Sequence, residues 1–300
     1  MAKNKRPILT VLVILGVIAL VLGTSMILFL KMVDPSAELS FSDRIGVIPI
    51  DGAITDAHEI TSQLIRFRKD KRIKAIVLRI NSPGGAVGPT QEIYREIRKT
   101  VETKSVVASL GGVAASGGYY IAAATDKIVA NPGTITGSIG VLMEFMRFED
   151  LLEKIGIKLE VLKSGEFKDI GSPHRELTKR DREIIDSLIA DIQGQFVKAV
   201  ANGRDLPLEK VNQIADGRVF SGARAKELDL VDVLGNFQDA VDVAKGMADI
   251  EGDAILVYPR KKRMELWESF VKGTARSVSE VFQGIKPRLE YKWGGFYASP

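Results

Sequence analysis

The chain has 300 residues, 45% of them hydrophobic and 27% charged, which is the composition of a globular protein with one large domain or two small ones. It contains no cysteine, which excludes thiol catalysis, disulfides and thiolate metal sites, and its two histidines are too few for a histidine-rich metal centre. The net charge of +4 is small, and the 42 Lys and Arg are interspersed with 38 Asp and Glu, so nucleic acid is not an expected partner.

The first feature along the chain is an apolar run. Residues 8–30 (ILTVLVILGVIALVLGTSMILFL) carry no charge, and about 20 apolar residues span a bilayer. The run is longer than the core of a secretory signal peptide and lacks a clear cleavage site, so it predicts an uncleaved transmembrane anchor. Lys3, Lys5 and Arg6 precede it, so the positive-inside tendency places residues 1–7 in the cytoplasm and the chain after the linker 31–43 on the other side of the membrane.

Strands and helices alternate in the next part of the chain. Apolar, β-branched runs predict strands, and apolar residues at helical spacing predict helices. The predicted strands are 45–50, 74–80, 105–110, 128–130 and 138–143, and the predicted helices are 57–67, 89–101 and 119–124. This alternation implies an α/β fold with a mainly parallel sheet covered on both faces. Sites in such folds are built from the loops at the carboxyl ends of the strands.

The character of the sequence changes after residue 162. Apolar residues four apart predict a long amphipathic helix over 178–200, and shorter helices are predicted at 208–215, 222–228 and 237–247. Residues 254–258 predict a last strand. The remaining tail is basic and aromatic, with an amphipathic helix expected near 266–282. Its basic residues favour acidic lipid headgroups as a partner, and a disordered end is the default expectation.

Two glycine-rich turns follow two of the apolar strands. Glycine lets a backbone N–H approach a ligand closely, so such turns suit the binding of an oxyanion. Gly84 and Gly85 follow one strand, and Gly117 directly follows Ser116 after the other. A serine at a strand-to-helix turn is typical of a nucleophile elbow, although alanine replaces the first glycine of the usual pentapeptide. Ordinary βα turns are the alternative interpretation, and a phosphate-binding loop fits poorly because no Gly-Lys-Ser/Thr follows either turn.

A serine nucleophile needs a base to accept its proton. His174 lies in a polar loop near Asp169, so a Ser–His–Asp triad stays open. Lysine is the other option, because burial lowers the pKa of a lysine and makes its amine a usable base. Spacing alone does not choose one lysine among many.

Five motifs in order resemble the short bacterial form of the signal peptide peptidase A family. The resemblance runs from about residue 44 to 250 and is carried by Asn81–Gly85 (NSPGG), Ala114–Tyr120 (AASGGYY), Thr136–Val141 (TGSIGV), Lys163–Pro173 (KSGEFKDIGSP) and Ala215–Gly222 (ADGRVFSG). It implies a crotonase-like fold related to the Clp protease, with a repeated β-β-α core in the domain 44–258, C-terminal helices and a tail over 259–300.

The resemblance also implies roles for single residues. Ser116 corresponds to the nucleophile, and Lys168 rather than Lys163 corresponds to the general base. Gly85 and Gly117 correspond to the backbone donors of the oxyanion hole, and Ser138 corresponds to a serine that hydrogen-bonds the lysine. No cofactor or metal is implied.

The function that the resemblance implies is a membrane-anchored serine endopeptidase that degrades cleaved signal peptides at the outer face of the bacterial cytoplasmic membrane. Members of the family look like ring or dome oligomers in which serine and lysine meet across a protomer boundary. The chain is similar to half of a tandem longer form. Three alternatives stay open: a related membrane protease acting on membrane-protein segments, a crotonase-type acyl-CoA enzyme, and a non-catalytic membrane scaffold.

Overall fold

The computed structural model describes residues 6–33, 43–259 and 288–292. Two units, residues 1–42 and 43–300, are each compact. The first contains helix α1 (Arg6–Val33). Among the described residues no helix is both long and apolar enough to cross a membrane, so the anchor expected over residues 8–30 is not supported. Within α1 the side chains are described from Val11 to Met26. This stretch is shorter than the about 20 residues that a bilayer requires.

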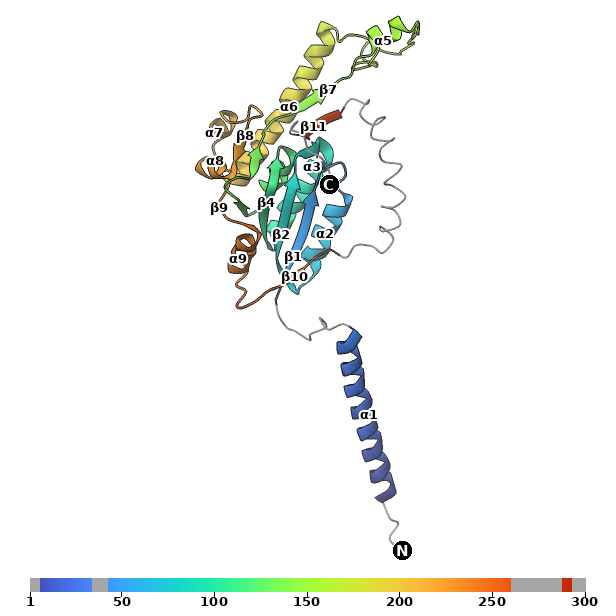
Figure 1. Ribbon diagram of the computed structural model, residues 1–300, viewed down its shortest axis with the longest axis vertical. Coiled ribbons are helices and arrows are strands. Elements are labelled where there is room, and N and C mark those ends of the chain that lie inside the picture. Colours follow the sequence, from blue (N-terminus) through green and yellow to red (C-terminus); the bar gives the residue numbers. More distant parts are fainter. Residues whose placement is uncertain (1–5, 34–42, 260–287, 293–300) are drawn as a thin grey trace. The chain divides into compact units, whose positions relative to one another are not determined.

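The second unit is built on a mainly parallel sheet. Its main path runs β10-β1-β2-β4-β5-β9, and β6 joins β4 to β8. The strands of this sheet are β1 (Arg44–Asp51), β2 (Ile73–Ser82), β4 (Ser105–Ala115), β5 (Lys127–Ala130), β6 (Ile135–Gly137), β8 (Val219–Ser221), β9 (Val233–Leu234) and β10 (Ile255–Val257). Within it only β6 and β8 pair antiparallel. The predicted parallel α/β core is therefore confirmed (Figure 1).

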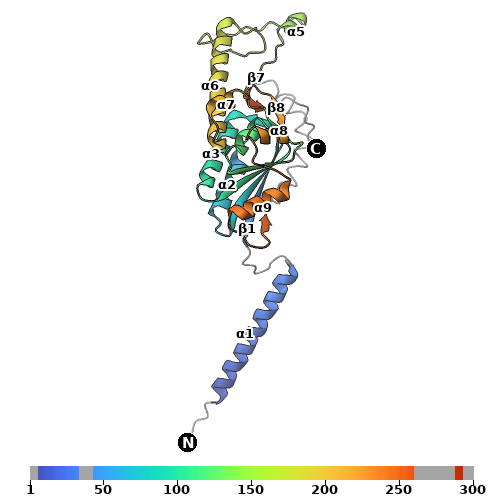
Figure 2. The ribbon, with the colours of Figure 1, turned by 90° about the vertical axis from the view of Figure 1, so that its left-hand side faces the viewer.

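Helices cover both faces of the sheet because its strands are apolar on both sides. Ile76, Leu78 and Ile80 of β2 face the larger core, and Ala75 and Val77 face a smaller core under α9. This division follows from the two-residue repeat of a strand. Among the described residues, the helices of this unit are α2 (His58–Lys69), α3 (Val87–Val101), α4 (Gly117–Ala122), α5 (Glu149–Lys154), α6 (Lys179–Arg204), α7 (Leu208–Asn212), α8 (Gly222–Glu227) and α9 (Phe237–Met247). Figure 2 shows α9 on the side of the sheet opposite α2 and α3.

The strand predicted over 138–143 is wrong. β6 ends at Gly137, and β7 (Leu142–Glu144) begins after a break. Gly137 has φ 78° and Ser138 has φ 50°, and these left-handed conformations interrupt an extended strand. Only the end of the apolar run therefore forms a strand, and β7 belongs to a second sheet.

The second sheet is small and contains part of the tail. Its order is β3-β11-β7, with β3 at Gly84–Ala86 and β11 at Arg288–Lys292. The default expectation of a disordered tail is therefore wrong for residues 288–292. The amphipathic helix expected over 266–282 lies outside the described residues.

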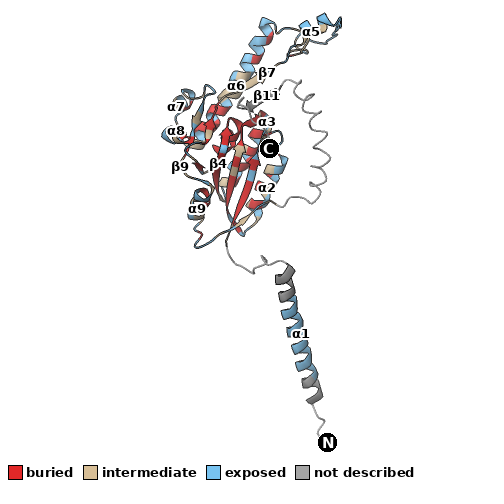
Figure 3. Ribbon diagram, in the orientation of Figure 1, coloured by how far each residue is buried: buried red, intermediate tan, exposed pale blue. Residues whose placement is uncertain are grey.

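Residues 145–178, here called the arm, connect β7 to α6. Figures 1 and 2 both show α5 and the start of α6 standing away from the sheet. Exposed side chains dominate the arm, whereas buried ones dominate the sheet (Figure 3). The apolar side chains of the arm are unusually exposed: Leu151 54%, Ile155 58%, Ile157 50%, Leu159 58% and Leu162 92%. Such a concentration of exposed apolar side chains marks an interaction surface.

Candidate active site

Ser116 lies at the turn from β4 into α4, where it is 1% exposed. Its backbone has φ 52° and ψ −116°, a conformation that non-glycine residues adopt at a cost of about 1–3 kcal/mol and that clusters at functional sites. The surroundings hold it there, since its N–H donates to the carbonyl of Gly137 at 2.8 Å and its carbonyl accepts from the N–H of Tyr120 at 2.8 Å. The hydroxyl is thereby presented at the N-terminus of a helix.

A bulge in β4 prepares this turn. Ile80 pairs with Leu110 but Ser82 pairs with Ala114, so β4 contains two more residues than β2 at this point. The side-chain oxygen of Asn81 accepts from the N–H of Val113 at 3.3 Å and fills the bulge. After the bulge, the partner of β4 on this side changes from β5 to β6. The asparagine of the NSPGG motif therefore directs the strand that ends at Ser116.

The two glycine-rich turns meet, as the sequence predicts. A Cβ on Gly117 would lie 3.1 Å from the backbone nitrogen of Gly85 and from the Cα of Gly84. Gly84 has φ 102°, which favours glycine. A Cβ on Gly85 would lie 2.1 Å from the carbonyl oxygen of Ile54, so only glycine fits. Two backbone amides, of Gly85 and Gly117, are consequently close to each other beside Ser116.

The TGS motif lies next to the same turn. The carbonyl that binds the N–H of Ser116 belongs to Gly137, so Ser138 is the next residue along the chain. Ser138 is 6% exposed, and its N–H donates to the carbonyl of Arg218 at 2.8 Å. Thus Ser116, Gly117, Gly85 and Ser138, predicted as neighbours, come from the ends of adjacent strands.

The tyrosines of AASGGYY anchor α4 in the core. The hydroxyl of Tyr119 donates to the carbonyl of Leu230 at 2.8 Å, and burial raises the pKa of Tyr119 well above its usual range. Tyr120 packs its ring against Tyr94 and Phe196 at centroid distances of 5.0 and 4.8 Å. These contacts fix the helix whose first residues flank Ser116.

The structure does not bring Lys168 to Ser116 within the described chain. The hydroxyl oxygen of Ser116 is buried and has no hydrogen-bond partner among the described residues. His174 of the same chain therefore does not form a hydrogen bond with this hydroxyl either. Lys168 is exposed on the arm. The ammonium of Lys163, in contrast, is bound to the carboxylate of Asp169 at 2.7 Å and to the carbonyl of Glu166 at 2.8 Å.

A network of ion pairs fixes the segment that carries Lys168. Arg175 binds Asp169 at 2.8 Å and Asp181 at 2.6 Å. Asp181 also accepts from the N–H of Thr178 at 2.9 Å, which completes a capping box at the start of α6. The arm is thereby connected to α6. The sequence offered no signal for this role of Arg175 beyond the charges themselves.

This network predicts a loss of stability in acid. Hydrogen bonds from Arg175 and Thr178 lower the pKa of Asp181 to about 2, below the unfolded value of about 3.9. The carboxylate therefore stabilises the fold above pH 4, and this contribution is lost as the pH falls toward 2. We expect Asp181→Asn to melt at a less pH-dependent temperature than wild type between pH 5 and pH 2.5. Equal slopes for the two proteins in thermal melts would contradict this role, and Asp186→Asn, on the same helix, is the control.

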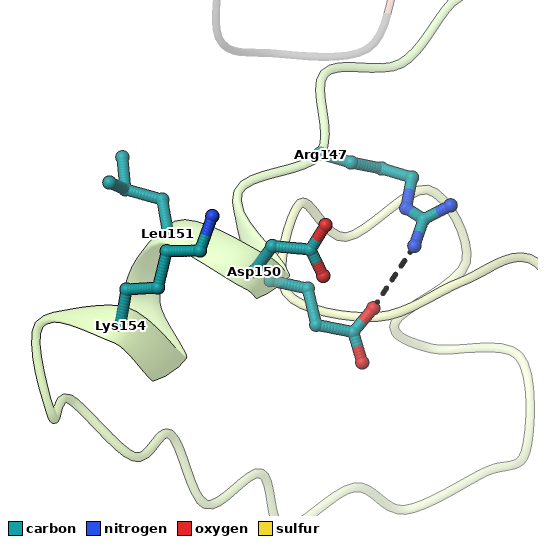
Figure 4. A pocket seen from close by; sticks show the side chains of 5 residues that line it. Arg147, Asp150, Leu151 and Lys154 are labelled. Atoms are coloured by element: carbon teal, nitrogen blue, oxygen red, sulfur yellow. Dashed lines mark hydrogen bonds and ion pairs between the residues drawn. The ribbon is translucent and has the colours of Figure 1, made fainter.

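A cavity of about 440 Å³ lies on the arm and is distinct from this site. It is lined by Arg147, Glu149, Asp150, Leu151 and Lys154. Figure 4 shows Asp150, Leu151 and Lys154 on α5 and Arg147 on the loop before it, and Arg147 pairs with Glu149 at 3.2 Å. It contains no nucleophile of the kind found at Ser116. No described cluster of His, Asp and Glu has the arrangement of a metal site.

A buried serine at a strand-to-helix turn, two neighbouring backbone amides and a parallel α/β core are the features of a serine hydrolase. The comparisons with known proteins agree. The family model of peptidase family S49 matches residues 98–251, and that of the Clp protease matches residues 37–134.

Individual relatives carry peptidase names. A protein of Synechocystis named as a protease is 45% identical over 219 residues, which cover 73% of this chain and 79% of that protein. An Enterococcus faecium protein named signal peptide peptidase SppA is 32% identical over 286 residues, covering 86% of this chain and 83% of that protein. Protease 4 of Salmonella typhi is 37% identical over 217 residues, which are 69% of this chain but 35% of that protein. The chain belongs to peptidase family S49 and is a serine peptidase, so the acyl-CoA enzyme and scaffold alternatives are excluded.

Proposed function

We propose that this peptidase cleaves peptides with a Ser116–Lys168 dyad that is completed by a second copy of the chain. The observation that carries the proposal is the hydroxyl of Ser116, which is buried yet has no partner among the described residues. A buried polar group without a partner is costly and is rarely left so in a native structure. The arm of a neighbouring chain, with its exposed apolar side chains, supplies the missing contact.

Lys168 is the proposed base because the other lysine of its motif is committed elsewhere. Lys163 is held by Asp169, whereas Lys168 is exposed and available to a neighbour. Insertion beside Ser116 of another chain removes water from the amine, which favours its neutral form. Ser138 lies next to the turn and is proposed to accept a hydrogen bond from this amine.

The reaction then proceeds as acyl transfer. The amine of Lys168 takes the proton of Ser116 as the hydroxyl oxygen attacks the scissile carbonyl carbon. The N–H groups of Gly85 and Gly117 bind the oxyanion, and the positive end of α4 adds to this stabilisation. The protonated lysine gives its proton to the leaving amine. Water then hydrolyses the ester by the same route.

We infer that the substrates are apolar peptides of the signal-peptide kind at the outer face of a membrane. The charge-free run 8–30 and the basic residues before it support this location from the sequence, and the relative named signal peptide peptidase SppA supports the substrate class. Membrane-protein segments are the rival substrate. Recovery of the full chain from cells in the soluble fraction would contradict the location.

A serine-directed phosphonate tests the catalytic serine and a substrate panel tests the class. We expect the phosphonate to label wild type at Ser116 and to leave Ser116→Ala unlabelled. The enzyme should cleave a synthetic signal peptide faster than a membrane-protein segment of equal length. Labelling at another serine would refute the proposed nucleophile, and the opposite order of rates would favour the rival substrate.

A further inference from the structure

Ser138 has a backbone conformation that its surroundings must hold. Its φ is 50°, in the left-handed region that a residue with a Cβ adopts only at a cost in free energy. Gly137 before it has φ 78°, so the chain turns at two successive residues directly after β6. The direction of the Ser138 hydroxyl follows from this turn, and the contacts that fix the turn therefore fix the hydroxyl.

The ADGRVFSG motif, to which no catalytic role is assigned above, lies against this turn. The N–H of Ser138 donates to the carbonyl of Arg218 at 2.8 Å. The N–H of Gly217 donates to the carbonyl of Ile139 at 3.1 Å. These two bonds continue the antiparallel pairing of β6 with β8 beyond the ends of both strands. A Cβ on Gly140 would lie 3.1 Å from the Cα of Gly217, so the two segments are in close contact.

Asp216 closes the turn of the motif through its carboxylate. The carboxylate accepts from the backbone N–H of Arg218 at 3.1 Å and from the Nε of the same residue at 2.8 Å. Gly217 lies between the two and has φ 86°, a conformation that favours glycine. Hydrogen bonds from the side chain and the backbone of Arg218 lower the pKa of Asp216 to about 2, so the carboxylate is ionised at neutral pH. The carbonyl that binds Ser138 thus belongs to a turn that a side chain fixes.

Gln193 of α6 binds both segments at once. Its Nε2 donates to the carbonyl of Ala215 at 2.8 Å and to that of Ile139 at 3.5 Å. Ala215 directly precedes Asp216, and Ile139 directly follows Ser138, so one amide group connects the motif to the turn. The Oε1 of Gln193 is buried and has no hydrogen-bond partner among the described residues. A buried polar atom without a partner costs free energy, so stability alone does not explain a glutamine at this position.

We propose that Gln193 and Asp216 are positioning residues of the peptidase, which hold Ser138 where its hydroxyl meets the amine of Lys168 from a second chain. This inference rests on the proposed function, in which Ser138 accepts a hydrogen bond from that amine. Both residues act through Ser138 and not on the substrate. A displaced Ser138 leaves the base out of line with the nucleophile, and small errors of this kind slow the chemical step. Substrate binding is unaffected, so kcat falls while KM stays the same.

Steady-state kinetics of the full-length enzyme with a fluorogenic peptide test the role of Gln193. Gln193→Met keeps the approximate size of the side chain but removes its N–H donors. We expect kcat to fall about tenfold, the effect of one lost hydrogen bond on the transition state, with KM unchanged. Gln195→Met, on the same helix, is the matched control. The amide of Gln195 binds only exposed side chains among those described, Asp191 at 3.1 Å and Gln91 at 2.8 Å, so this variant should keep wild-type kinetics.

A double-mutant cycle separates positioning from a general effect on the structure. If Gln193 acts through Ser138, the double variant Ser138→Ala/Gln193→Met has the kcat of Ser138→Ala alone. Asp216→Ala provides a second cycle in case Gln193→Met does not fold, because the side chain of Asp216 is 50% exposed. We expect its kcat to be lowered as well, with no further loss in Ser138→Ala/Asp216→Ala. Circular dichroism confirms that each variant is folded.

Two results would overturn the positioning role while leaving the proposed function intact. One is a wild-type kcat in folded Gln193→Met and Asp216→Ala beside a reduced kcat in Ser138→Ala. The other is a multiplication of the separate losses in the double variants, which would show that these residues act elsewhere. Full activity of Lys168→Ala would instead refute the proposed dyad, and the positioning role with it.

Discussion

We expect chains of Ser116→Ala and Lys168→Ala, each inactive alone, to regain peptide cleavage when they are mixed before assembly. Each single variant should lose at least about a thousandfold in kcat, because it removes the nucleophile or its base. In a closed ring of head-to-tail contacts, random mixing gives about a quarter of the sites both an intact serine and an intact lysine. The expected result is therefore about a quarter of wild-type activity, measured with a signal peptide as substrate.

Lys163→Ala and Ser138→Ala are the companion variants. The ammonium of Lys163 binds Asp169 within the motif, so its loss should lower activity without abolishing it. Ser138→Ala should also keep partial activity, because it removes a positioning hydrogen bond and not the base. No recovery in the mixture, in chains that still assemble by light scattering, would place both groups in one chain and contradict the two-chain site.

Gly85→Ala should reduce kcat about a hundredfold or more. A Cβ here would lie 2.1 Å from the carbonyl oxygen of Ile54, so the strand must shift and its N–H moves away from the developing oxyanion. Removal of one oxyanion-hole donor costs about 10²–10³ in kcat. The measurement is kcat and KM for a peptide substrate, beside circular dichroism to confirm that the variant is folded.

Gly88→Ala is the matched control for this prediction. Gly88 is three residues further along the same chain segment, and a Cβ on it meets nothing within 4 Å. Its variant should keep wild-type kinetics. Folded Gly85→Ala with an unchanged kcat would show that the amide of Gly85 does not bind the oxyanion.

Much of the core could be predicted because its signals are local. The strand predicted at 74–80 is β2, and the helix predicted at 178–200 is α6 with its end extended to Arg204. The meeting of the two glycine-rich turns also followed from the sequence, since the carboxyl ends of parallel strands share one edge of a sheet.

Other features depend on contacts that no local pattern reveals. β11 is a five-residue strand with charged residues at both ends, and it forms only because two distant edges accept it. The bulge in β4 depends on the side chain of Asn81, which precedes Val113 by 32 residues along the chain. The resemblance implied that serine and lysine meet across a protomer boundary, whereas the order of motifs alone does not say which chain completes a site.

Strands β3 and β7 hydrogen-bond one extended strand between them from both sides, and this arrangement has a consequence for selectivity. Strands on both sides bind a guest through its main chain, which every peptide shares, so side-chain identity contributes little to binding there. A segment already paired within a folded protein has no free edges to offer and is rejected. We expect an unfolded segment to be accepted there with few restrictions other than proline, which lacks an N–H. Selection by conformation would then come before any selection by sequence.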